Sequence, residues 1–214
     1  MRKAFTFLEL IIVVVIVAIL SVIALQYLYR PDYLVEVVDR AISDLRYTQH
    51  LALSDDKYED RDVAGGYAWE KTRWKLQFAQ DTNGLWLYRI FADRYVAGAT
   101  LNGLDGVPQD DEYAIDPLTH QFLAGGDDDR FVPALSLGKN MEITNVVVRL
   151  GSGFKPQTTI MFDERGKPIT QSCNPTFCDP AAWVRETITI TFTHRDGESM
   201  SICILPITGF VDRC

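Results

Sequence analysis

A long apolar run near the N-terminus is the strongest pattern in the chain. Ser21 is the only residue in 10–25 that is not apolar, and extension back to Phe5 gives about 20 residues, enough for a helix to cross a bilayer. Arg2 and Lys3 precede the run, so we expect the N-terminus to be cytoplasmic. The residues that follow the run are then expected on the opposite side of the membrane. A cleaved secretory signal and a plain signal anchor are the alternatives.

Glu9 places a carboxylate inside this apolar run. An ionised carboxylate in the middle of a membrane helix costs on the order of 2.5–3.5 kcal/mol, and a secretory signal or a plain anchor gains nothing from it. If the chain is cut between Ala4 and Phe5, the new α-amine lies four residues before Glu9, on the same helical face. The ammonium and the carboxylate can then pair within one chain or between neighbouring chains, which favours assembly.

The string RKAFTFLELIIVVVIVAILSVIAL (residues 2–25) closely resembles the N-terminus of type IV pilins and type II secretion pseudopilins. The resemblance implies cleavage after Ala4 by a prepilin peptidase, N-methylation of Phe5 and a role for Glu9 in assembly. It also implies a single-pass protein of the bacterial inner membrane, with a cytoplasmic N-terminus and a periplasmic globular domain, that later enters a filament. The family usually has glycine before the cut, where this chain has Ala4.

The pattern becomes amphipathic after the apolar run. Positions on one helical face recur at spacings of three and four residues: Leu34, Val38, Ala41, Leu45, Gln49 and Ala52. Asp39, Arg40, Asp44 and Arg46 fall elsewhere on the helix. Pro31 predicts a kink or an interruption before this segment, and residues 54–56 predict its end. We expect this helix to lie with its apolar face on a following domain.

Strict alternation of polar and apolar residues predicts β-structure in the rest of the chain. One hairpin is expected from residues 72–78 and 85–91 around Asn83-Gly84, and another from residues 187–193 and 201–205 around Asp196-Gly197. Residues 145–150 and 158–162 are further strand candidates.

The patterns together predict an α+β fold, in which a long N-terminal helix packs on an antiparallel β-sheet domain. The helix is expected to be transmembrane in its first half and amphipathic in its second half. The expected boundaries are a leader at 1–4, a transmembrane helix at 5–29, an amphipathic continuation at 30–54 and a β-rich globular periplasmic domain at 55–214.

Two short strings carry a second resemblance. IMFDERGKP (residues 160–168) and ILPITGFV (residues 204–211), with an alternating hairpin between them, are similar to the globular domain of the minor pseudopilin H and pilin-assembly T subfamily. Two features recur in that subfamily. One is a strand followed by a glycine turn, and the other is a Thr-Gly pair before the last strand.

The four cysteines all fall in the last fifth of the chain: Cys173, Cys178, Cys203 and Cys214. An even count in one region favours disulfides in an oxidising compartment, although three pairings are open, and a zinc site and free thiols are the alternatives. The shortest loops would join Cys173 to Cys178 and Cys203 to Cys214, which would pin the C-terminus to a strand.

Composition and charge limit the other classes of function. The formal net charge of −8 repels phosphate backbones, so nucleic acid is not an expected partner. Residues 110–112 and 127–129 are acidic and could attract calcium, but they lack the spacing of a calcium loop and indicate a solvated loop instead. We therefore expect no metal and no cofactor.

Aromatic residues and nucleophiles do not suggest an active site either. Trp74 and Trp86 lie on opposite arms of the first hairpin, so we expect them to pack across the strands, and Trp69 and Trp183 are also assigned to the core or a sheet face. No spacing of Ser, His, Cys or carboxylates nominates a catalytic group, and no enzymatic activity is expected.

The sequence thus predicts a minor pilin or pseudopilin that assembles into a type IV pilus-like or type II secretion filament. The expected partners are other pilin or pseudopilin subunits, the prepilin peptidase and the inner membrane. One alternative is a DNA-uptake minor pilin, since a member type of the resembling subfamily binds DNA through basic residues near its C-terminal glycine. This chain has only Arg213, beside Asp212, at that place. A membrane-tethered periplasmic enzyme is the other alternative.

Overall fold

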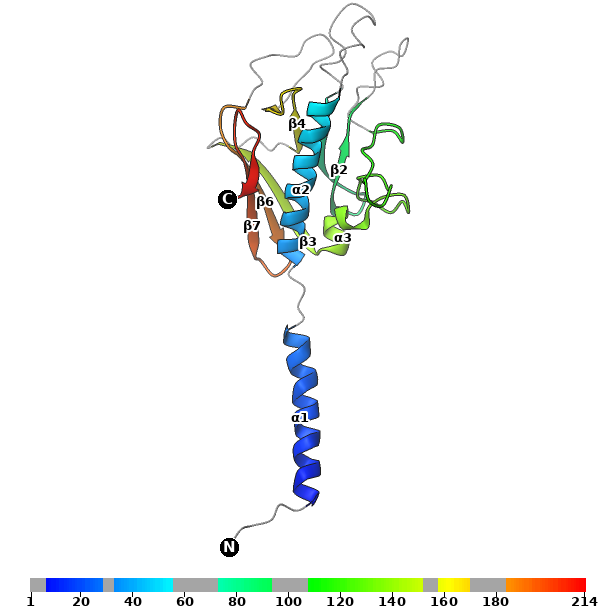
Figure 1. Cartoon of the computed structure of the whole chain (residues 1–214), viewed down its shortest axis with the longest axis vertical. Helices are drawn as coiled ribbons and strands as arrows, with labels where there is room; N and C mark the ends of the chain where they lie inside the picture. Colours follow the sequence, from blue (N-terminus) through cyan, green and yellow to red (C-terminus); the bar gives the residue numbers. More distant parts are fainter. Residues whose placement is uncertain (1–6, 29–32, 56–72, 94–107, 152–157, 170–183) are drawn as a thin grey trace, which may run out of the picture. The chain divides into compact units, whose positions relative to one another are not determined.

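The chain divides into two compact units in the computed structural model, Met1–Asp32 and Tyr33–Cys214 (Figure 1). The structure describes residues 7–28, 33–55, 73–93, 108–151, 158–169 and 184–214. The first unit contains the helix α1 (Phe7–Leu28). The second unit, called the β unit below, contains all the other helices and strands described.

The expected single long N-terminal helix is wrong. The structure describes two helices, α1 and α2 (Tyr33–Ser54), which belong to different units. Among the described residues, no helix is found that is both long and apolar enough to cross a membrane. Pro31 lies in residues 29–32, outside the described part of the chain. The sequence predicts a kink or an interruption at Pro31, because proline lacks an amide donor, but the continuous long helix was expected in spite of it.

The helix α2 packs on the β unit as the amphipathic pattern predicts. Its face Leu34, Val38, Ala41, Leu45 and Ala52 is buried, and it contacts strands of both sheets described below. It ends at Ser54, where the sequence predicts the end of the helix.

The described residues of the β unit form two antiparallel four-stranded sheets where one was expected. The first sheet has the order β2-β1-β4-β5, with β1 (Lys75–Gln80), β2 (Trp86–Phe91), β4 (Thr159–Phe162) and β5 (Pro168–Ile169). The predicted hairpin between β1 and β2 is confirmed. Its turn is closed by Asp81, whose Oδ1 accepts hydrogen bonds from the amides of Asn83 and Leu85, each at 2.8 Å.

The second sheet has the order β3-β6-β7-β8, with β3 (Ile143–Leu150), β6 (Ile188–His194), β7 (Ser199–Ile204) and β8 (Val211–Arg213). The predicted hairpin between β6 and β7 is confirmed. Ile188, Ile190 and Phe192 are buried, whereas the threonines between them are only half-buried. This alternation is what a sheet with one face in the core requires.

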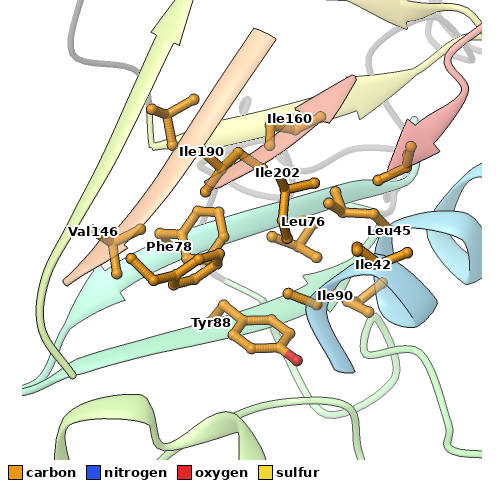
Figure 2. Packing of buried hydrophobic residues seen from close by; sticks show 14 of the residues in the cluster. Ile42, Leu45, Leu76, Phe78, Tyr88, Ile90, Val146, Ile160, Ile190 and Ile202 are labelled. Carbon is orange, nitrogen blue, oxygen red and sulfur yellow. The ribbon is translucent and has the colours of Figure 1, made fainter. Parts of the chain in front are cut away.

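The core lies between α2 and the two sheets. Figure 2 shows Ile42 and Leu45 of α2 facing buried side chains of the strands. Phe78 of the first sheet joins the two sheets, because its ring centroid lies 5.7 Å from that of Tyr88 and 5.8 Å from that of Phe192. The short helices η3 (Pro133–Leu135) and α3 (Leu137–Asn140) close the core beside β2.

The expected cross-strand contact between Trp74 and Trp86 is wrong. Trp86 pairs with Gln80 in the register of the hairpin, and Trp74 precedes β1 at its opposite end. Both indoles are partly buried against the core, and Trp74 Nε1 donates a hydrogen bond to Asp55. Trp69 and Trp183 lie outside the described residues.

Candidate functional site

The surface of α1 is apolar on all sides. From Phe7 to Val22 only Glu9 and Ser21 are not apolar, and the large apolar side chains are between 43% (Ile11) and 78% (Phe7) exposed. The Ser21 hydroxyl donates to the carbonyl of Val17 at 2.7 Å, so this polar group is satisfied within the helix. A helix that is hydrophobic all round is normally covered by protein or lipid.

Glu9 lies in the first turn of α1. A negative charge is favourable there, because the unpaired amides at the start of a helix carry a partial positive charge. Ala4 and Phe5 lie outside the described residues, so cleavage between them, methylation of Phe5 and a pairing of the new α-amine with Glu9 stay predictions.

The C-terminus is fastened to the second sheet by a disulfide. Cys203 in β7 is bonded to Cys214, with a Cα–Cα distance of 5.1 Å. The amide of Cys214 also donates to the carbonyl of Ser201 at 3.1 Å. This is the pairing that the shortest loops predict, and Cys173 and Cys178 lie outside the described residues.

Replacing Cys203 and Cys214 together by serine is expected to lower the free energy of unfolding by about 3 kcal/mol. The reason is that the cross-link restricts the unfolded chain, and the size is that for a loop of about a dozen residues. Urea unfolding with and without a reductant measures it. With reductant present in both samples, the wild type should match the double variant; equal stability of the two without reductant would contradict the prediction.

The two strings of the second resemblance meet in the structure. Gln49 Nε2 donates to the carbonyl of Gly166 at 2.7 Å and to that of Thr208 at 3.0 Å, so α2 joins the two segments. Gly209 has φ of +66°, and a Cβ there would collide with the carbonyl oxygen of Gly166. A glycine is therefore required at 209 by both backbone conformation and space. The periodicity of α2 places Gln49 on the inward face but does not indicate this bridging contact.

Arginines of α2 and β8 hold the C-terminal strand against α2. Arg46 Nη2 donates to the carbonyl of Val211 at 2.7 Å. Arg213 forms an ion pair with Asp39 at 2.6 Å. Arg213 is the basic residue on which the DNA-uptake alternative depends, and its charge is therefore paired with a carboxylate.

A polar cluster lies between α2 and β2. Asp44 is only 5% exposed, although the helical pattern placed it off the apolar face, and this placement was wrong. Its Oδ2 accepts hydrogen bonds from the Tyr88 hydroxyl at 2.7 Å and from Arg40 Nε at 3.0 Å. Arg40 also lies 3.5 Å from Asp116. The arginine one helical turn before Asp44 is the sequence signal that could have indicated this pair.

Burial raises the pKa of Asp44 above its usual value near 3.8, and the hydrogen bond from Tyr88 and the charge of Arg40 only partly oppose this. The folded state therefore holds the proton more tightly than the unfolded chain does. Stability contributed by this group is present below pH 3.8 and is lost as the pH rises through the folded-state pKa.

Replacing Asp44 by asparagine should remove this pH dependence. The free energy of unfolding of the wild type, relative to that of the variant, is expected to fall as the pH rises from about 4, because only the wild type has to ionise a buried carboxyl. Unfolding in urea at several pH values measures it. A relative stability that rises with pH would mean that Arg40 outweighs burial.

Carboxylates of both acidic segments pair with basic side chains. Arg130 contacts both Asp110 and Asp128 at 2.6 Å, and Lys139 contacts Asp127 at 2.6 Å. Among the described residues, no group of three or more His, Cys, Asp or Glu side chains could hold a metal ion. Arg130 thus links the acidic segment 110–112 to the acidic segment 127–129.

Comparisons of the chain with protein-family models, with curated proteins and with solved structures find no match. The family resemblance therefore rests on the residues themselves.

Proposed function

We propose that this chain is a minor pilin-like subunit that assembles with other pilin or pseudopilin subunits into a type IV pilus-like or type II secretion filament. The observation that carries the proposal is the helix α1, which is apolar on all sides and exposed along its described side chains. Such a surface needs a cover, and a bundle of α1 helices from several subunits would provide one.

The core of the β unit supports this role for α1. Its buried cluster contains residues from Leu34 to Val211 and none of the described side chains of α1. The β unit can therefore keep its fold while α1 is taken up by other subunits. Each square ångström of apolar surface removed from water contributes about 25 cal/mol, so α1 is not expected to stay exposed to water outside the membrane or the filament.

Glu9 would set the register of the bundle. Its carboxylate lies at the N-terminal end of an otherwise apolar helix, where a cation on a neighbouring subunit would be a favourable partner. We propose that this cation is the α-amine of Phe5, produced by a prepilin peptidase that cuts after Ala4 and methylated afterwards.

We propose that processing takes place at the bacterial inner membrane and that the β unit works in the periplasm. The disulfide between Cys203 and Cys214 supports the second part, because disulfides persist in oxidising compartments. Fractionation of cells that make the chain, with protease added to the periplasm, tests the location of the β unit. Protection of the β unit from the protease in intact spheroplasts would contradict it.

The test of the proposed function is recovery of the chain with a filament. Filaments sheared from cells or released from the envelope are separated by size, and their subunits are identified by mass spectrometry. We expect the chain in the filament fraction, in smaller amount than a major subunit. Its recovery only as a free monomer, from cells that do make filaments, would contradict the proposal.

A further inference from the structure

The polar cluster between α2 and β2 includes one residue, Asp116, of a short hairpin. The hairpin covers residues 115–121 and is called the Asp116 tip below. Its base is fixed to the first sheet, because the amide of Ala114 donates to the carbonyl of Ile90 at 2.9 Å. The amide of Ile90 in turn donates to the carbonyl of Leu123 at 2.8 Å. Both strands of the hairpin are therefore anchored to β2 just before the tip begins.

Hydrogen bonds within the Asp116 tip maintain its shape. The amide of Asp116 donates to the carbonyl of Gln121 at 2.8 Å, and the amide of His120 donates to the carbonyl of Asp116 at 2.9 Å. Asp116 Oδ1 accepts a further hydrogen bond from the amide of Leu118 at 2.9 Å. The side chain of Leu118 is 88% exposed, so the end of the tip lies in solvent. A tip that is bonded within itself and anchored at its base can move as one unit.

Two side chains of α2 attach the Asp116 tip to the helix. The Tyr47 hydroxyl donates to the carbonyl of Ile115 at 3.2 Å. Arg40 Nη2 lies 3.5 Å from Asp116 Oδ2. A charge-assisted hydrogen bond is normally shorter, about 2.8 Å. Both attachments are therefore long, and the charged one is not at its strongest.

Arg40 also serves a second carboxylate. Its Nε donates to Asp44 Oδ2 at 3.0 Å, which is the shorter of its two contacts. Asp44 is 5% exposed and Asp116 is 6% exposed, so water screens their charges poorly. One cation thus lies between two buried carboxylates, and a closer approach to one of them weakens its contact with the other.

The two carboxylates differ in how readily they take up a proton. Burial acts to raise the pKa of Asp116, but hydrogen bonds from Leu118 and Thr119 and the charge of Arg40 bring it below the usual value. Burial dominates at Asp44 and raises its pKa above the usual value. As the pH falls, Asp44 is therefore protonated while Asp116 is still ionised.

The other ionisable groups of the cluster keep their charge state over this range of pH. Asp44 faces Tyr88 from β2, Arg40 from its own helix and Asp116 from the tip. Burial raises the pKa values of Tyr88 and Tyr47 above the usual value of 10, so both hydroxyls stay neutral. The Arg40 guanidinium stays charged. Asp44 is the group of this cluster whose charge changes.

We propose that Asp44 and Arg40 form a proton-controlled latch for the Asp116 tip. With Asp44 protonated, Arg40 is free to pair with Asp116, and the tip is held on α2. With Asp44 ionised, Arg40 is drawn toward Asp44 and the two carboxylates repel each other, so the tip is released. The proton passes between solvent and the Asp44 carboxyl group, and no other bond is made or broken.

The direction of the pH dependence follows from linkage. The negative charge of Asp116 raises the pKa of Asp44 when the tip is closed, and an open tip removes this effect. Protonation of Asp44 therefore favours the closed tip, and closure is lost as the pH rises through the folded-state pKa of Asp44. The β unit would present two different surfaces, one below this pH and one above it.

The distance between two spin labels tests the latch in the full chain, purified in detergent micelles. One label is attached at Leu118→Cys on the tip and the other at Ser43→Cys, on an exposed position of α2. Between pH 4 and pH 8 we expect the ratio of closed to open tip to fall about tenfold, a usual size for the coupling of two sites. The chain without introduced cysteines measures the background labelling.

Three comparisons identify the group and the place of the movement. Asp44→Asn should keep the tip closed at both pH values, because asparagine cannot ionise. His120→Asn should respond like the wild type, although His120 lies on the tip, because its side chain is exposed. Labels at Ser43→Cys and Asn145→Cys, an exposed position of β3, should keep a constant distance.

The latch is overturned if the wild-type distance does not change with pH, or if Asp44→Asn changes in the same way. Loss of the response in His120→Asn would also overturn it, because the titrating group would then be the histidine. The wild-type titration leaves the cluster intact, so it stays decisive if Asp44→Asn fails to fold. The latch works within a single chain, so its failure would leave the proposed function untouched, and the reverse also holds.

Discussion

Glu9→Gln should remove the chain from assembled filaments while leaving its total amount in the cell unchanged. Glutamine keeps the size of the side chain but not its charge, so a charged partner from a neighbouring subunit would be left unpaired in the apolar bundle. Breaking one half of a buried ion pair costs about 3–5 kcal/mol. Since 1.4 kcal/mol corresponds to a factor of ten, incorporation should fall by about a hundredfold or more.

The measurement is a quantitative immunoblot of sheared filaments and of whole cells. Ser21→Ala is the matched control, because Ser21 is the other polar residue among the described side chains of α1 and bonds only to its own helix. It should be incorporated like the wild type. Equal incorporation of Glu9→Gln and the wild type would mean that the charge at this position has no part in assembly.

Phe192→Ala is expected to lower the free energy of unfolding of the β unit by about 3–5 kcal/mol, the usual cost of truncating a buried phenylalanine. Phe192 is fully buried in β6 and its ring meets that of Phe78 edge to face, across the junction of the two sheets. The cavity left by its removal would lie where neither sheet can close it alone. This loss is a large fraction of the stability of an ordinary domain, which is about 5–15 kcal/mol.

Urea unfolding of the purified chain, followed by tryptophan fluorescence and extrapolated to water, measures this loss. Thr191→Ala is the matched control on the same strand. The Thr191 hydroxyl is half-buried and bonds to that of Ser201 at 2.8 Å, so its loss should cost about 1 kcal/mol. If the two variants lose similar free energies of unfolding, the contact between the sheets at Phe192 does not contribute specially to the stability of the core.

Local pattern predicted the strands well but not the way in which they divide into two sheets. Both hairpins could be predicted, because alternation and a turn such as Asn83-Gly84 are local signals. The pairing of Leu76 with Ile160 joins residues far apart in the sequence, and nothing local specifies that register. The number of sheets therefore could not be derived from single strands.

The apolar face of α2 could also be predicted, but the polar contacts beneath it could not. The helical pattern placed Asp44 off the apolar face, where charged residues normally lie. It is buried because Tyr88, which is distant in the sequence, donates a hydrogen bond to it. Gln49 is the converse case, a polar residue on the inward face whose two acceptors lie on separate loops.

For the N-terminal segment, the sequence suggested a family but not the extent of the helix. Its motif is local and specific enough to suggest a family, yet the expected long helix was wrong. The described part of α1 ends at Leu28 and α2 begins at Tyr33, and the residues between them lie outside the described part of the chain. The roles of Ala4, Phe5 and Glu9 depend on partners outside the chain, so they stay predictions.

Intact-mass analysis with N-terminal sequencing of the protein from its native membrane, without reduction, tests the central claim most directly. The account predicts a chain that begins at N-methylated Phe5, with a mass lower by two hydrogens for each disulfide. A start at Met1 would reduce the apolar run to an unprocessed segment. A start near Leu25 would mean that α1 is removed, and the role proposed for α1 and Glu9 in assembly would be wrong.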